Sequence, residues 1–351
     1  MKKKSLVLIT LGIIVASFLI WQSYIKDKDS ILNGKKDVNV QLQWFDGAQF
    51  AGLYVALERG YFSDENLNVT LTPIAGYTSD PIALLTDNEA DIAIATADQV
   101  LINKDKGKEI KAFGTVFNRS LACFTFKSDL LHGEKDSIPL SILKNKKIAV
   151  YKKFDTESIL LALDYKYKLN LDKKDIVQAP QLALEALIND DIDFLGSYMI
   201  NEPIKFKLNG LNVKYLDPAK YGVNFYSDTY IAKTEVWYNT GKNQITKETL
   251  VKFLKAANKG WSYCKLHPKE AIDIMFSHIK NKTKSEDYKM ELLSLMKAIQ
   301  YIGDGPNNIP SYMLKEKWIG MEKDLFNIRR ISQTGYIDEL CDFDLINKID
   351  E

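Results

Sequence analysis

The sequence is poor in the residues that most catalytic and metal sites require. Its three histidines and three cysteines are scattered, and no CxxC pair occurs. Metal sites need closely spaced ligands, so the common metal motifs are excluded. The patterns GxGxxG, GxxxxGK[ST], HExxH and GxSxG are also missing, which removes the usual phosphate loops and nucleophile elbow. We therefore expect no catalytic residues, no metal and no cofactor, and we interpret the chain as a non-enzyme.

An excess of charge of either sign is missing as well. Lys and Arg number 47 against 46 Asp and Glu in 351 residues. A nucleic-acid partner would need a basic excess on one face, so we expect none. The cysteines, Cys123, Cys264 and Cys341, are more consistent with isolated buried thiols than with a disulfide. The length allows one large or two medium domains.

The N-terminus is the one long hydrophobic run. Three lysines, Lys2 to Lys4, precede an uncharged apolar stretch from Leu6 to Trp21. This pattern predicts either a cleaved secretory signal or an uncleaved membrane anchor over residues 1–25, and both place the rest of the chain outside the cytoplasm. No cysteine follows the run, which excludes a lipid-modified cysteine at that position. Residues 26–37 are charged and polar and read as a linker.

Strand-like and helix-like segments then alternate at short intervals. Alternating or small apolar residues predict strands at 38–44, 67–73, 90–95, 110–117, 146–151, 175–179, 191–198 and 226–233. Helical spacing of Phe50, Leu53, Tyr54 and Leu57 ends at Gly60, and Asp155 or Thr156 is placed to cap a later helix. The last third is helix-rich, with further helices expected to begin at Pro268 and Pro310.

This alternation predicts an α/β fold with two lobes, each a mostly parallel sheet flanked by helices. Both a hinged binding protein and a bilobal enzyme fit that pattern. In either case the ligand lies between the lobes, at the carboxyl ends of the strands.

Several segments together resemble the periplasmic solute-binding proteins for thiamine pyrimidine precursors. The stretch LQWFDGAQFAGLYVALERGYFSDENLNVTL carries most of the resemblance, through Gln49–Gly52 and Gly60–Phe62, although Asn66–Val69 replaces the usual Gly-Leu-Asp-Val. The segments DIAIATAD, NEP at residues 201–203 and YGVNFYSDTYIA add to it. The resemblance covers residues 38–261 well and the helical tail weakly.

The resemblance implies a type II periplasmic-binding-protein fold that closes around a small heterocycle and delivers it to an ABC permease. Lobe 1 would comprise residues 38–125 and 229–351, and lobe 2 residues 126–228. We expect a monomer at the cell surface or in the periplasm. The pyrimidine is expected to contact aromatic faces and a few polar groups. The predicted ligand-binding residues are Trp44, Phe45, Gln49, Asp98, Phe117, Tyr151, Glu202, Tyr226 and Asp228.

Structural roles compete with several of these assignments. Trp44 reads equally as a lid on the core, and Glu202 precedes Pro203, so its carboxylate also suits a helix start. Two other functions remain open: a pyrimidine-precursor synthase on the same fold, and a membrane-tethered sensory domain. The synthases of this superfamily carry a cysteine-rich motif, which this sequence lacks.

Overall fold

The computed structural model describes residues 34–76, 79–131, 138–152, 154–240, 245–279, 284–303 and 309–349. The predicted signal or anchor at residues 1–25 lies outside these ranges, as does most of the linker. Within the described ranges, no helix is both long enough and apolar enough to cross a membrane.

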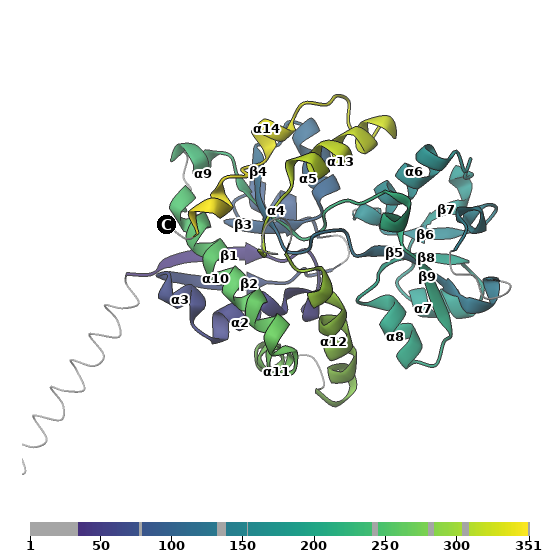
Figure 1. Ribbon diagram of the computed structural model, residues 1–351, viewed down its shortest axis with the longest axis horizontal. Coiled ribbons are helices and arrows are strands. Elements are labelled where there is room, and N and C mark those ends of the chain that lie inside the picture. Colours follow the sequence, from purple (N-terminus) through teal and green to yellow (C-terminus); the bar gives the residue numbers. More distant parts are fainter. Residues whose placement is uncertain are drawn as a thin grey trace, which may run out of the picture.

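Two five-stranded sheets stand side by side (Figure 1). We call each sheet with its helices a lobe. The sheet of lobe 1 has the order β2-β1-β3-β10-β4. Its strands are β1 (Lys36–Gln41), β2 (Leu67–Thr72), β3 (Ile92–Ala95), β4 (Ile110–Thr115) and β10 (Thr229–Lys233). The sheet of lobe 2 has the order β7-β6-β8-β5-β9. Its strands are β5 (Ala122–Lys127), β6 (Ile148–Val150), β7 (Ile176–Gln178), β8 (Phe194–Tyr198) and β9 (Val213–Leu216).

The chain passes between the lobes twice. The strand that follows each crossing is the one that runs antiparallel to its neighbours in the sheet it enters. The first crossing follows β4 and leads into β5, which runs antiparallel to β8 and β9. The second follows β9 and leads into β10, which runs antiparallel to β3 and β4. The other four strands of each sheet share one direction, so the predicted pair of mostly parallel sheets is confirmed. β5 begins at Ala122, a few residues before the boundary expected from the sequence.

Helices cover both faces of the lobe 1 sheet (Figure 1). One face carries α2 (Ala51–Glu58), α3 (Tyr61–Asp64), α10 (Lys247–Leu266) and α11 (Pro268–His278). The other carries α4 (Pro81–Thr86), α5 (Ala97–Asp105), α13 (Lys315–Asn327) and α14 (Ile337–Leu340). Two further helices are α9 (Glu235–Tyr238) and α12 (Lys284–Ala298), the second of which reaches lobe 2.

Lobe 2 is covered by three helices, with α6 (Asp155–Tyr167) on one face and α7 (Ala183–Ile188) and α8 (Glu202–Leu208) on the other. The core beneath α6 continues past the crossing into lobe 1. It joins Leu163 of α6 and Phe225 of the second crossing to Trp318 of α13. On this side the lobes therefore share one apolar core.

The contact between α2 and α10 sets the position of the loop before α2. Gly52 lies so close to Trp261 that a Cβ added there would come within 2.2 Å of the indole ring. A Cβ on Gly260 would lie 2.0 Å from the carbonyl oxygen of Gly52. Two glycines thus let these helices approach closely and hold the start of α2 in place.

Local sequence signals hold in several places and fail in one. The apolar stripe of α2 is buried, Gly60 follows its end with a φ of 74°, and the three cysteines are free and buried. The helix expected at Pro310 is a wrong prediction. Residues 312–314 are non-helical, Ser311 has a φ of 68°, and α13 begins only at Lys315.

Candidate functional site

A cavity lies between the lobes, beside the loop that follows β1 and the N-terminal ends of α6 and α8. We call it the inner cavity; the empty space in and in front of it, open solvent included, is about 370 Å³. Its aromatic walls are Trp44, Tyr151, Phe154 and Tyr198. Its polar lining is Gln43, Gln49, Thr156, Ser197, Asn201 and Glu202. The cavity therefore offers flat apolar faces with a few hydrogen-bonding groups, which is typical of a small-molecule site.

The aromatic side chains meet across the gap between the lobes. Trp44 of lobe 1 stands edge-to-face with Phe154 and Tyr151 of lobe 2, with ring centroids 4.9 and 5.8 Å apart. Phe45 is more exposed and lies 5.5 Å from Trp44 at the mouth. Because these rings are nearly perpendicular, a planar ligand placed between them would stack on one ring and meet the other edge-on.

Glu202 lies at the start of α8 and also lines the inner cavity. It is the first residue of α8, and its Oε2 accepts a hydrogen bond from the backbone N–H of Tyr198 at 3.0 Å. Its carboxyl also lines the inner cavity, and burial raises its pKa. A hydrogen-bond donor on a ligand would therefore meet an acceptor that little water solvates.

Gln49 and Asp228 form a polar pair across lobe 1. The Nε2 of Gln49 donates to Oδ1 of Asp228 at 2.7 Å, and Ser227 Oγ donates to Oδ2 at 2.8 Å. Asp228 is fully buried, and burial raises its pKa against the lowering effect of these hydrogen bonds. Gln49 lines the inner cavity, whereas Asp228 lies behind it and fixes the Gln49 amide.

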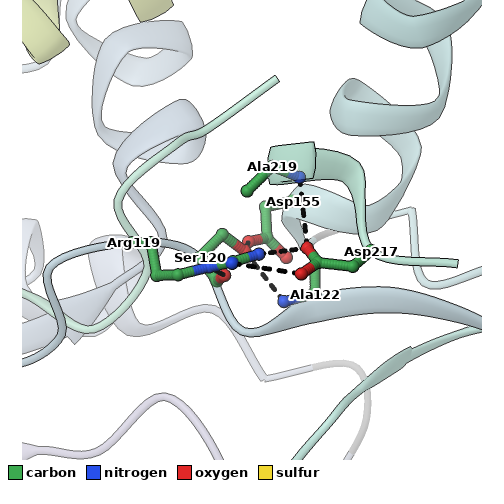
Figure 2. Close-up of polar contacts among 6 residues, drawn as sticks. All are labelled: Arg119, Ser120, Ala122, Asp155, Asp217 and Ala219. Atoms are coloured by element: carbon green, nitrogen blue, oxygen red, sulfur yellow. Dashed lines mark hydrogen bonds and ion pairs between the residues drawn. The ribbon is translucent and has the colours of Figure 1, made fainter. Parts of the chain in front are cut away.

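Asp155 was expected to cap α6, and the structure assigns it differently. No side chain caps this helix; the Asp155 carboxyl turns inward and accepts from Ser120 Oγ at 2.5 Å and Tyr198 Oη at 3.2 Å. Burial, together with the nearby Asp98 carboxylate, raises the pKa of Asp155 to about 8. Figure 2 shows the contact of Asp155 with Ser120 of the first crossing. Through its second oxygen Asp155 also connects this crossing to Tyr198 of the inner cavity.

One further contact joins the two crossings to each other, and another joins α6 of lobe 2 to α5 of lobe 1. Arg119 of the first crossing forms a bidentate pair with Asp217, one arm of which is Nη1 to Oδ2 at 3.2 Å (Figure 2). Asp217 also accepts from the backbone N–H of Ala219 at 3.2 Å, just before the second crossing. In addition, Ser158 of α6 donates to Asp98 of α5 at 2.6 Å, which joins the lobes directly.

The structure brings five predicted residues to the cleft: Trp44, Phe45, Gln49, Tyr151 and Glu202.

The other four predicted residues lie behind the cleft. Asp98 and Asp228 are fully buried at the lobe interface. Phe117 packs against Trp261 in the core. Tyr226 lies in the second crossing, where its Oη accepts from the backbone N–H of Leu314 at 2.9 Å.

Sequence reasoning missed six residues that line the inner cavity: Gln43, Phe154, Thr156, Ser197, Tyr198 and Asn201. Three of them carried a usable signal. Phe154 and Thr156 follow β6, and Tyr198 ends β8, so all three stand at the carboxyl ends of parallel strands, where ligands of such sheets bind.

Outside the inner cavity the cleft widens into a groove lined in part by α7, α8 and α12. Its empty volume is about 1190 Å³. The groove includes Phe45, Glu185, Lys205 and Glu291. Glu291 of α12 accepts from the backbone N–H of Ala48 at 2.7 Å, so α12 holds the loop that carries Trp44.

Comparison with known proteins gives a consistent result. The family model described as NMT1/THI5 like matches residues 47–271. The formylaminopyrimidine-binding protein of Halalkalibacterium halodurans is 24% identical over 259 residues, which cover 69% of this chain and 70% of that protein.

Solved structures show the same fold at low identity. The periplasmic nitrate-binding protein NrtA of Synechocystis PCC 6803 aligns with a TM-score of 0.65 at 11% identity, over 90% of this chain and 88% of that one. The ligand-binding component of an ABC-type import system from Staphylococcus aureus gives 0.63 at 13%, over 90% and 99%. The two-lobed fold is thus that of periplasmic binding proteins.

Proposed function

Because the chain belongs to the NMT1/THI5-like family, we propose that it is the extracytoplasmic solute-binding component of an ABC-type uptake system. It binds a thiamine pyrimidine precursor, or a similar small heterocycle, between its two lobes. The protein acts as a monomer that passes its ligand unchanged to a permease in the membrane.

The observation that carries this proposal is the chemistry of the inner cavity. Trp44 on one lobe and Tyr151 and Phe154 on the other bring aromatic rings from both lobes to the cavity, where they meet edge-to-face. Among the described residues that line this cavity, Glu202 is the one acidic residue and none is Lys or Arg. An anion would be repelled by Glu202 and would find no cation there, whereas a neutral or cationic aminopyrimidine would find stacking and an acceptor.

The relatives support the same assignment at different levels. The formylaminopyrimidine-binding relative supports a pyrimidine ligand. The neighbour from an ABC-type import system and the nitrate-binding neighbour both share the fold alone with this chain. The fold is compatible with delivery to a permease outside the cytoplasm, and the cavity chemistry argues against an anionic ligand.

Calorimetry and thermal melting of the purified protein test the proposal. The probes are 4-amino-5-hydroxymethyl-2-methylpyrimidine, its N-formylaminomethyl analogue, riboflavin, ethanesulfonate and nitrate. We expect a pyrimidine to raise the melting temperature, because a ligand that binds the folded state stabilises it by mass action. Tighter binding of ethanesulfonate or nitrate than of either pyrimidine would overturn the ligand assignment.

Chromatography of the pyrimidine after prolonged incubation tests whether the chain alters its ligand. Turnover would overturn the passive transport role, and formation of a pyrimidine by the purified protein alone would establish the synthase function. Glu202→Gln is the matched variant, since it keeps the shape of the side chain and removes its charge. We expect Glu202→Gln to weaken pyrimidine binding by roughly tenfold, as for a lost hydrogen bond to a charged group.

A further inference from the structure

Gln43 stands at the junction of two cavities. It follows β1 by two residues, at the carboxyl end of that strand, and lines the inner cavity. It also lines a neighbouring recess together with Thr96 and Asp80. Phe154 of lobe 2 is the other described residue shared by both spaces, so Gln43 and Phe154 form the wall between them.

The Gln43 amide is buried without partners. The residue is 2% exposed, and neither Nε2 nor Oε1 has a hydrogen-bond partner. The side chain faces Asp228 and helps to lower the pKa of that carboxyl, but without full hydrogen-bonding geometry. The hydroxyl of Thr96, across the recess, is also buried and without a partner. Polar groups in this condition destabilise a folded protein unless a ligand or water completes them.

Two nearby glutamines show the contrast. The Nε2 of Gln41, the last residue of β1, donates to the backbone oxygens of Leu42 and Thr72 at 2.9 and 3.1 Å. The Nε2 of Gln49 donates to Asp228. Both amides are therefore held by the protein itself, whereas the amide of Gln43 is not.

A glutamine amide presents a hydrogen-bond donor and an acceptor side by side. The complementary edge is an exocyclic amine next to a ring nitrogen, the pairing by which Asn and Gln side chains bind the N6/N7 edge of adenine. We propose that Gln43 determines ligand specificity by pairing with such an amine–ring-nitrogen edge on a planar heterocycle in the inner cavity. This inference rests on the proposed function and extends it to one edge of the ligand.

The placement of the aromatic walls fits this pairing. Gln43 and Trp44 are adjacent and both line the inner cavity. Rotation about the terminal side-chain bond exchanges the positions of the amide donor and acceptor, so the side chain can match either order of these groups on the ligand edge. Glu202 then accepts from a donor elsewhere on the ring, from the side of lobe 2.

Two ligands that differ by a single group test the proposal on the full chain. They are 4-amino-5-hydroxymethyl-2-methylpyrimidine and 5-hydroxymethyl-2,4-dimethylpyrimidine, in which a methyl replaces the amine. Calorimetry on the wild type should show a preference of at least roughly tenfold for the amine, the scale of a hydrogen-bonded edge against one left unpaired. In Gln43→Met the preference should fall to about threefold or less.

Gln41→Met is the matched control, because it makes the same change two residues earlier, at the end of β1. It should keep the preference for the amine and lower the melting temperature, since it removes two hydrogen bonds within the protein. Gln43→Met should leave the melting temperature of the ligand-free protein unchanged or higher, because it removes an amide that has no partner there.

The ligand preference and the melting temperature can each contradict the inference independently. A preference that persists in Gln43→Met would overturn the specificity role while leaving the proposed function intact. A melting temperature lowered in Gln43→Met as much as in Gln41→Met would show that the amide has partners inside the protein, and would overturn the inference without any ligand. Binding of neither pyrimidine by the wild type would refute the proposed function and this inference with it.

Discussion

Replacing Asp155 by Asn should stabilise the protein at alkaline pH and change the pH dependence of folding. The carboxyl is fully buried and accepts from Ser120 and Tyr198, but burial and the Asp98 carboxylate raise its pKa to about 8. In an unfolded chain an aspartate titrates near 4. Between these values the folded protein holds a proton that the unfolded chain has released.

The sign and size of the effect follow from linkage. The folded state binds more protons over this range, so the contribution of Asp155 to stability is fully present below about pH 4 and is lost as the pH rises towards 8. Each pH unit in the window is worth up to about 1.4 kcal/mol. Asn cannot ionise, so the difference in unfolding free energy between variant and wild type should grow by about 2 to 3 kcal/mol from pH 5.5 to 7.5.

Urea unfolding at several pH values measures this difference. Asp228 and Glu202 also have raised pKa values. Comparing variant and wild type at each pH removes the part of their contribution that does not depend on Asp155, whose pKa the charge of Asp228 helps to raise. Asp172→Asn is the control. Asp172 is exposed, and the backbone N–H of Lys174 lowers its pKa, so its replacement should give a small effect of opposite sign. A pH-independent difference for Asp155→Asn would refute the reasoning.

Three more substitutions test other parts of the structure. Trp44→Ala should weaken pyrimidine binding by more than tenfold, about 1.4 kcal/mol, and should lower the stability of the ligand-free protein by less. Calorimetry and thermal melting measure the two losses, and a larger loss of stability than of binding would show that Trp44 is mainly a core residue. Arg119→Met should lower the unfolding free energy in urea by about 2 kcal/mol, because it leaves the Asp217 charge partly buried and unpaired. The Arg119→Met/Asp217→Leu double variant should lose less, and an equal loss would show that the stability comes from the pairing itself and not from the unpaired charge. Gly52→Ala should cost about 3 kcal/mol or more, since its methyl would overlap Trp261; unchanged stability would contradict the close helix contact.

Local patterns were enough to predict the fold, because most of its strands and helices are indicated by the spacing of apolar residues within a short stretch of sequence. The buried stripe of α2 and the glycine after it follow from spacing alone. The sequence did not reveal β5 in the same way, because its first five residues are all buried and show no alternation. β9 has four residues, too few for periodicity to identify it.

The candidate site was less predictable because long-range contacts decide which polar residues face inward. Asp155 sits where a helix cap belongs, and only the approach of Ser120 and Tyr198 turns its carboxyl to the interior. Gln43 lies in an alternating strand pattern that reads as solvent-facing, and Phe154 of the other lobe helps to bury it. Trp44, by contrast, was predicted because an aromatic residue at a strand end stands out in the sequence, and the structure places it in the lining of the inner cavity; its contact with a ligand stays a prediction.

The apolar core shared by the lobes has a consequence for the rates of binding. Leu163, Phe225 and Trp318 belong to one core on the side of the crossings, so we expect the lobes to turn about that side if they separate, which would break the edge contacts of Trp44. If the cavity binds a ligand as proposed, the ligand would enter through the open form, and the observed association rate should level off at high ligand concentration at the rate of opening. The same opening step would then limit the release of the ligand.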